Sequence, residues 1–317
     1  MSKKSHKLLK TVLFIGGAVG AMYYFNKYII NSAKSKNKLK TDTDSYYEWK
    51  EGNIYYKKHG EGLPLLLIHD FSQHSSSYEW TKLIDSLSET HTVYTLDLLG
   101  CGRSDKPQIN YTNFLYVQML KDFIHDIIGE KTSIITSGFS SSFAIMTHTY
   151  DRSLIDKLIF INPADIKEVN KKPGTFSYIF KDLLELPILG TFIYNLITSK
   201  GNIDSLLTEQ YFYNPFNIDD DTIETYYESA HRGNGNGKFV YSSIVGCYIG
   251  ANICNSLKYM ENDILIIKGD AAPDMDNICK EYKELNDSIK SATISKTKKL
   301  PHFESSEKVL KAIKSFL

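Results

Sequence analysis

The stretch VYTLDLLGCGRSDKP, residues 93–107, joins a β-type apolar run to a loop rich in glycine and charged side chains. Runs of the same kind recur along the chain, and several are apolar at consecutive positions, which is typical of strands covered on both faces. Amphipathic helical patterns lie between them, for example at 78–87, 115–128 and 307–317. This alternation predicts a mostly parallel α/β sheet flanked by helices. The predicted strands are 54–56, 65–69, 92–96, 133–136, 158–161, 264–267 and 292–295.

One long interval, residues 166–255, interrupts the alternation with helical, aromatic-rich sequence that contains no evident strand. A stretch of about ninety residues is too long for an ordinary loop. We therefore expect a helical cap, inserted between two strands and lying over the strand ends. On this interpretation the chain has an N-terminal segment at 1–30, a polar linker at 31–45 that is too poor in apolar residues to pack, and one domain at 46–317.

The N-terminal segment contains an uncharged stretch, TVLFIGGAVGAMYYF at 11–25, with lysines on both sides. As a helix it spans about 23 Å, short of a hydrocarbon core of about 30 Å, and flanking lysines and tyrosines extend its reach. The pattern predicts a single-pass membrane anchor and hence a membrane location. Lysines flank both ends about equally, so the side of the membrane stays open. A cleaved signal peptide and a soluble helix are the alternatives.

Composition argues against several other classes of protein. The 37 basic and 37 acidic residues give a formal net charge of +0, which provides no electrostatic footprint for nucleic acid. The four cysteines have neither the spacing of a metal site nor that of a disulfide framework. We expect no metal and no cofactor. The cysteines are Cys101, Cys247, Cys254 and Cys279.

Five motifs occur in the order and approximate spacing of one known fold family. They are LLLIHDFSQHSSSYEW at 65–80, VYTLDLLGCGRSDKP at 93–107, SGFSSSFA at 137–144, ILIIKGDAAPD at 264–274 and LPHFESSEKVLKAIKSFL at 300–317. Through them the chain resembles the α/β-hydrolase fold superfamily over about residues 47–317. The resemblance implies a capped, mostly parallel sheet, a serine–histidine–acid triad, and a loop at 97–105 tied together by its charged side chains.

The resemblance nominates a nucleophile in Gly138-Phe139-Ser140-Ser141-Ser142, where small residues two before and two after a serine permit a sharp strand-to-helix turn. Ser140 is the candidate nucleophile, and a serine-rich helix cap is the alternative. The implied oxyanion hole uses the backbone N–H groups of Ser141 and Phe71. The family usually has His-Gly in the latter loop. Here the pair is His69-Asp70, which brings a carboxylate close to where an oxyanion would form.

The other triad positions depart from the family pattern. Ala272 stands at the acid position after the penultimate strand, and Asp165 is the substitute that the resemblance nominates. Ungapped matching of the last loop places Lys299 at the histidine position. Making His302 the base requires a gap of three residues beside a helix start. A lysine is protonated near neutral pH, so Lys299 is not expected to act as a base.

Three functions remain open. The chain is interpreted as a membrane-anchored protein of this fold with impaired catalysis that binds a hydrophobic small molecule or a partner. The alternative is an active serine hydrolase of esters, thioesters or amides that uses Ser140, His302 and Asp165. The third is an interaction protein whose pocket is filled. A serine hydroxyl without a base is a poor nucleophile, so the position of His302 relative to Ser140 separates the first two.

Overall fold

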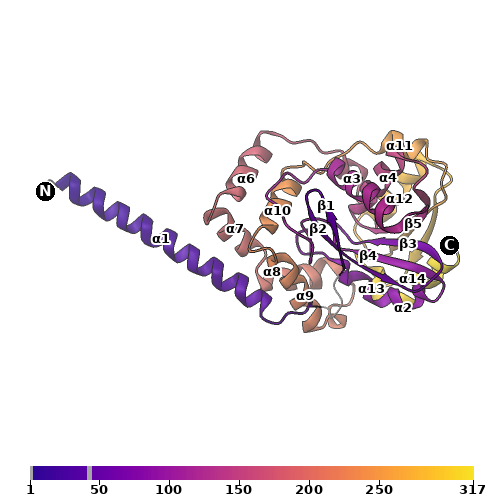
Figure 1. Ribbon diagram of the computed structural model, residues 1–317, viewed down its shortest axis with the longest axis horizontal. Helices are drawn as coiled ribbons and strands as arrows, with labels where there is room; N and C mark the ends of the chain where they lie inside the picture. Colours follow the sequence, from indigo (N-terminus) through magenta and orange to yellow (C-terminus); the bar gives the residue numbers. More distant parts are fainter. Residues whose placement is uncertain (1–2, 41–44) are drawn as a thin grey trace.

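The computed structural model describes residues 3–40 and 45–317, and within them the core is an eight-stranded sheet (Figure 1). The strand order is β1-β2-β4-β3-β5-β6-β7-β8, with β1 and β2 antiparallel to their neighbours and the remaining strands parallel. This arrangement confirms the predicted mostly parallel α/β sheet. The strands are β1 Ser45–Trp49, β2 Gly52–His59, β3 Leu63–Ile68, β4 His91–Leu96, β5 Thr132–Ser137, β6 Ile155–Ile161, β7 Ile264–Gly269 and β8 Lys290–Ile294.

Helices cover both faces of the sheet, as the consecutive apolar runs predicted. Successive side chains of a strand point to opposite faces, so Leu66 and Ile68 enter one core cluster while Leu65 and Leu67 enter the other. All four side chains are fully buried. The flanking helices include α2 Thr81–Ser88, α3 Asn113–Phe123, α4 Ser140–Tyr150, α12 Met275–Leu285, α13 Pro301–Glu304 and α14 Ser306–Lys314.

The segment between β6 and β7 forms the cap, which contains helices and, among the described residues, no strand. In Figure 1 the cap helices α6 to α10 gather on one side of the sheet. The α-helices of the cap are α5 Ile166–Val169, α6 Thr175–Glu185, α7 Leu189–Ile197, α8 Lys200–Ser205, α9 Asp220–His231, α10 Gly237–Val245 and α11 Cys254–Lys258. Two short helical turns, η3 Leu206–Tyr211 and η4 Pro215–Asn217, lie between α8 and α9.

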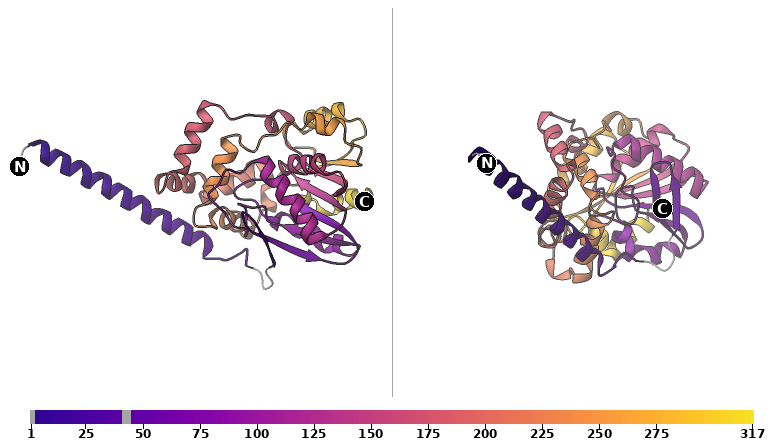
Figure 2. Two further views of the ribbon diagram at one scale, coloured as in Figure 1. Left: turned by 45° about the horizontal axis from the view of Figure 1, so that its top comes forward. Right: turned by 60° about the vertical axis from the view of Figure 1, so that its left-hand side comes forward.

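The N-terminal segment is one long helix, α1 Lys3–Lys34, which projects from the body in both Figure 1 and Figure 2. Its C-terminal part packs on the cap, where the Asn26 side-chain amide donates to the Ile188 carbonyl at 2.9 Å. Farther toward the N-terminus, Val12, Leu13 and Phe14 are exposed. Searched over the residues that the structure describes, no helix is both long enough and apolar enough to cross a membrane.

The predicted polar linker is wrong over its described part. Residues 31–34 continue α1, and both Ala33 and Leu39 are buried against the cap. The backbone N–H groups of Lys38 and Leu39 donate to the carboxylate of Glu228 on α9. This segment therefore fixes α1 to the cap. Residues 41–44 lie outside the described residues.

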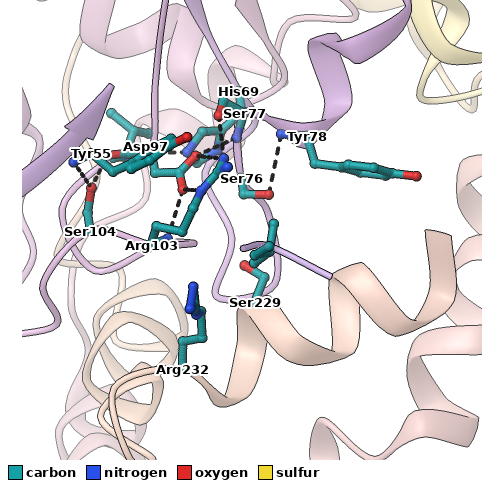
Figure 3. Close-up of polar contacts among 12 residues, drawn as sticks. Tyr55, His69, Ser76, Ser77, Tyr78, Asp97, Arg103, Ser104, Ser229 and Arg232 are labelled. Atoms are coloured by element: carbon teal, nitrogen blue, oxygen red, sulfur yellow. Dashed lines mark hydrogen bonds and ion pairs between the residues drawn. The ribbon is translucent and has the colours of Figure 1, made fainter. Parts of the chain in front are cut away.

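An ion pair beneath the cap holds the loop that follows β4 (Figure 3). Asp97 is fully buried and accepts hydrogen bonds from the Arg103 guanidinium at 2.7 and 3.0 Å and from the backbone N–H of Ser77 at 2.7 Å. Burial opposes ionisation, but the charge and the hydrogen bonds of Arg103, with a smaller contribution from His69, together hold the pKa of Asp97 well below its usual range. The pair thus ties the loop at 97–105 to the segment that follows β3.

Replacing Asp97 with alanine is expected to lower the free energy of unfolding by about 3–5 kcal/mol, because Arg103 is left buried without its partner. Urea unfolding at neutral pH measures the change. The matched control is Asp156→Ala, which breaks an ion pair with Lys131 whose two side chains are about half exposed. The control should cost less than about 1 kcal/mol. Equal losses in the two variants would contradict a structural role for the buried pair.

Candidate functional site

The candidate site is a cavity of about 1130 Å³ between the cap and the carboxyl ends of the strands. Its floor comes from residues that directly follow parallel strands, which is where open α/β sheets usually bind ligands. Its walls come from the cap and combine apolar and aromatic side chains with polar and charged ones such as Glu168, Lys171 and Asn202. The floor includes Asp70 after β3, Gly138 and Phe139 after β5, Asn162 after β6, Ala272 after β7 and Lys299 after β8, and the walls include Ile197, Ile203, Leu206, Tyr211, Tyr241 and Ile244.

The strand-to-helix turn between β5 and α4 places a glycine where the backbone is strained. Gly138 has φ +55°, a left-handed conformation that L side chains rarely adopt. A Cβ atom at this position would lie 2.1 Å from Oδ1 of Asp70. A nucleophile elbow carries its nucleophile on the strained turn residue. In this chain that residue has no side chain.

The predicted nucleophile, Ser140, lies two residues later, in the first turn of α4. It is fully buried, and its hydroxyl donates to the carbonyl oxygen of His69 at 2.6 Å. The backbone N–H of Ser141, a predicted oxyanion donor, is used within the turn by the carbonyl oxygen of Gly138. The assignment of Ser140 to the strained position was therefore wrong by two residues. Phe71, the other predicted donor residue, does line the cavity.

The carboxylate of Asp70 occupies the space above Gly138. Its Oδ1 accepts a hydrogen bond from the backbone N–H of Phe139 at 2.9 Å, and its Oδ2 lies 2.7 Å from Nζ of Lys299. In an elbow, the N–H that follows the strained residue is the one that faces a developing oxyanion. Here an internal anion already uses that donor. The expectation that the His69-Asp70 pair brings a carboxylate to this place agrees with these contacts.

Lys299 connects this carboxylate to the cap. Its ammonium donates to the Tyr211 hydroxyl at 3.3 Å, and His74 shares that hydroxyl through Nε2 at 3.0 Å. Burial lowers the pKa of Lys299, but the Asp70 charge, the Tyr211 hydroxyl and the hydrogen bonds to both together raise it above its ordinary value. Burial, and then the Lys299 charge, lower the pKa of His74 to about 3. At neutral pH Lys299 is charged and His74 is neutral.

The remaining predicted triad members are not brought together with Ser140. His302 is fully buried and stacks on Trp80 with ring centroids 4.6 Å apart. Its Nε2 lies 3.6 Å from Oε1 of Glu79, and neither ring nitrogen has a hydrogen-bond partner among the described residues. Asp165 caps α5 by accepting from the backbone N–H of Lys167 at 2.7 Å. The alternative triad is therefore not assembled in this structure.

The acid position and its surroundings contain one residue that the sequence analysis missed. Ala272, which the spacing assigns to the acid position, lines the cavity. Asn162, directly after β6, has φ +42° and donates through its amide to the carbonyl oxygens of Lys298 and Lys299 at 2.8 and 3.0 Å. It positions the loop that carries Lys299. The sequence could have indicated this residue, because Asn162 is a polar residue directly after an apolar strand. Among the described residues, no cluster of side chains could hold a metal ion.

The capped, mostly parallel sheet is the architecture of the α/β-hydrolase fold, and comparisons with known proteins agree with that fold. The family model for the alpha/beta hydrolase fold matches residues 63–204. A soluble epoxide hydrolase from Corynebacterium sp. (strain C12) is 28% identical over 109 residues, which is 34% of this chain and 37% of that protein. The chain thus spans about a third of the length of the curated relatives it matches.

Solved structures extend the likeness to most of the chain. A serine hydrolase involved in carbazole degradation has a TM-score of 0.71 at 18% identity, over 86% of this chain and 98% of that one. A membrane phospholipase A, described as a bacterial virulence factor, has a TM-score of 0.69 at 19% identity, over 98% of this chain and 97% of that one. The chain has the α/β-hydrolase fold.

Lys299→Met would leave the Asp70 carboxylate buried without its cation. We expect the free energy of unfolding at pH 7 to fall by about 2–3 kcal/mol, less than for a fully buried pair because part of Lys299 is solvent-exposed. The double variant Asp70→Asn/Lys299→Met should recover most of the loss, because no unpaired charge remains. Failure of the double variant to recover would show that packing, and not charge, accounts for the loss.

The same variants carry a pH signature. Lys299 and the Phe139 N–H hold the folded-state pKa of Asp70 below its unfolded value, so the pair stabilises the fold above about pH 4 and loses its effect as the pH falls further. The stability difference between wild type and Lys299→Met should be constant from about pH 6 to 9 and shrink in acid. Chemical unfolding at a series of pH values measures it.

Proposed function

We propose that this chain is a membrane-associated α/β-hydrolase-fold protein that binds a hydrophobic small molecule in its cavity and does not hydrolyse it through a serine. The observation that carries the proposal is the composition of the floor. Gly138 occupies the strained turn, the Asp70 carboxylate fills the space above it, and Lys299 neutralises that carboxylate.

Without a serine nucleophile and a histidine base, the expected loss of turnover is large. Removing the nucleophile or the histidine of a serine triad costs on the order of a millionfold in turnover. An oxyanion hole and binding alone leave roughly a thousand- to ten-thousandfold over water. In this chain the backbone N–H of Phe139, which would be the oxyanion donor at this turn, already binds the Asp70 carboxylate. Part of the rate acceleration that an oxyanion hole would supply is therefore lost as well. Neither Lys299, which is charged, nor His74, whose pKa is lowered to about 3, replaces the base at neutral pH.

The cavity favours an amphiphile whose polar end is uncharged or zwitterionic. Its volume of about 1130 Å³ exceeds that of typical drug-sized sites. Apolar cap side chains such as Ile203, Leu206 and Ile244 line its walls. At the floor, the Asp70 and Lys299 charges compensate each other, so this pair does not attract an ionic head group. Tyr211 and the exposed part of Lys299 offer hydrogen bonds instead.

Helix α1 supports the membrane association. Its N-terminal part extends from the body and presents Val12, Leu13, Phe14 and Ile15 to solvent, with exposures of 56 to 78%. Large apolar surfaces left open on a soluble body commonly mark interaction sites. The likeness to the membrane phospholipase A covers 98% of this chain, a share that has to include α1. That protein's description as a membrane enzyme agrees with a membrane role for α1.

A fluorophosphonate probe tests the catalytic part of the proposal. We expect no labelling of wild type above a heat-denatured sample, and the same result for Ser140→Ala, because the Ser140 hydroxyl is buried and bonded to a backbone carbonyl. An active serine hydrolase run in parallel confirms that the probe is reactive. Labelling that disappears in Ser140→Ala would overturn the proposal and restore the hydrolase alternative.

Nile red, an uncharged hydrophobic dye, tests the binding part. Ile244→Trp narrows the cavity and should weaken dye binding by about tenfold, which corresponds to about 1.4 kcal/mol. Ile84→Trp on α2 is the matched control. Ile84 packs against the core cluster that contains Leu65 and Leu67 and does not line the cavity, so this substitution should leave the affinity for the dye unchanged. Fluorescence titration gives both values. Equal affinities in the two variants, or no binding by wild type, would contradict the cavity as the ligand site.

A further inference from the structure

Helix α6 of the cap carries an apolar stripe that faces outward. Phe176, Ile179, Phe180 and Leu183 follow an i, i+3, i+4, i+7 spacing and therefore share one side of the helix. Phe176 is 88% exposed, Ile179 62% and Phe180 37%. The side that α6 turns toward the body carries the buried Leu184. In a globular protein the apolar side of an amphipathic helix normally faces the core, so this orientation requires an explanation.

The stripe continues around the corner that leads to α7. Leu186 and Leu189 are exposed there, at 45% and 38%. We use the name α6 surface for the six side chains Phe176, Ile179, Phe180, Leu183, Leu186 and Leu189. With this length and spacing, the α6 surface resembles an amphipathic helix that lies in the plane of a membrane interface.

The α6 surface lies next to the point where α1 leaves the body. Asn26, which donates to the Ile188 carbonyl in the α6–α7 corner, directly follows the uncharged stretch 11–25. The rings of Phe25 and Phe192 are in contact beside it, with centroids 5.2 Å apart. Both Figure 1 and the left view of Figure 2 place α6 at the edge of the body on the side toward which α1 extends. One flat bilayer could therefore contact both.

Charges around the α6 surface complement an anionic lipid head group. Lys171 and Lys172 are exposed just before α6, and Lys27 is exposed on α1 near the same corner. On α6 itself, the Glu185 carboxylate is paired with Lys181 at 2.8 Å, and Asp182 is exposed. Lys171 lies 3.5 Å from the exposed carboxylate of Glu168, which leaves Lys172 and Lys27 as the cations here that have no carboxylate partner among the described residues. Basic residues beside an exposed apolar stripe are the pattern of interfacial helices on anionic membranes.

We infer that the α6 surface docks on an anionic lipid bilayer and fixes the body with its cavity mouth toward the lipid. Lys171 lines the cavity and also adjoins α6, so the mouth and the docking surface share an edge. A hydrophobic ligand could then pass between bilayer and cavity without crossing water. The inference rests on the proposed membrane association of α1 and adds a second, independent contact.

Tryptophan fluorescence in the full-length protein tests the contact. Trp49 and Trp80 are buried, so an added surface tryptophan reports its own surroundings. We expect Phe176→Trp to shift to the blue and to be quenched by vesicles of phosphatidylglycerol and brominated phosphatidylcholine. An interfacial helix lies roughly 5–10 Å into the head-group boundary, so bromines near the head group should quench more than bromines near the chain ends.

Leu63→Trp is the matched control for the quenching experiment. Leu63 is 74% exposed, but it begins β3 and therefore lies at the end of the sheet opposite the cavity and the cap. It should show neither shift nor quenching. Adding Lys171→Gln and Lys172→Gln to Phe176→Trp should reduce the quenching by the brominated lipid. Salt should lower the quenching of this triple variant less than it lowers that of Phe176→Trp alone, because fewer screened charges attract the lipid.

Each contrary outcome points to a different failure. If wild type floats with vesicles but Phe176→Trp is not quenched, α1 binds the membrane alone and the α6 contact is refuted. If wild type does not float with vesicles, the proposed membrane association itself fails, and the inference fails with it. If Phe176→Trp shifts to the blue without lipid while sedimentation shows a doubled mass, a second copy of the chain covers the α6 surface and the bilayer contact is refuted.

Discussion

The site depends on one internal ion pair, between Asp70 and Lys299, which stands on the N-terminal end of α4. The pair connects three segments that are distant in sequence: the end of β3, the turn after β5 and the loop after β8. The Phe139 N–H and the positive end of the helix dipole both favour the carboxylate at this point. Since a buried charge is tolerated only when paired, the two side chains hold these segments in one arrangement.

The same constraint determines the charge at this part of the cavity floor. A bare helix N-terminus attracts anions, but here Asp70 already provides the anion. Lys299 compensates that charge and contacts the Tyr211 hydroxyl of the cap, which His74 shares. The ion pair therefore connects the strand ends to the cap that forms the cavity walls.

Much of the fold could be predicted from sequence, because strands covered on both faces must be apolar at consecutive positions. The edge strand β1, SYYEW, was missed since it is short and only one of its five residues is buried. The elbow was misplaced for a physical reason. Thr136-x-Gly138-x-Ser140 and Gly138-x-Ser140-x-Ser142 fit the same spacing of small residues, and only the backbone torsion at Gly138 distinguishes them. The structure places Lys299 at the cavity floor beside Asp70, and its assignment to the histidine position stays a prediction.

A glycine at the strained turn explains why the sharp turn between β5 and α4 costs little free energy. A left-handed residue with a side chain costs of order 1–3 kcal/mol, which an enzyme offsets elsewhere in its structure, whereas glycine adopts the conformation almost freely. A side chain there would also collide with Asp70. The turn still aims the Phe139 N–H into the site, where it now binds an internal carboxylate. Through this hydrogen bond the turn after β5 and the end of β3 support each other in the folded state.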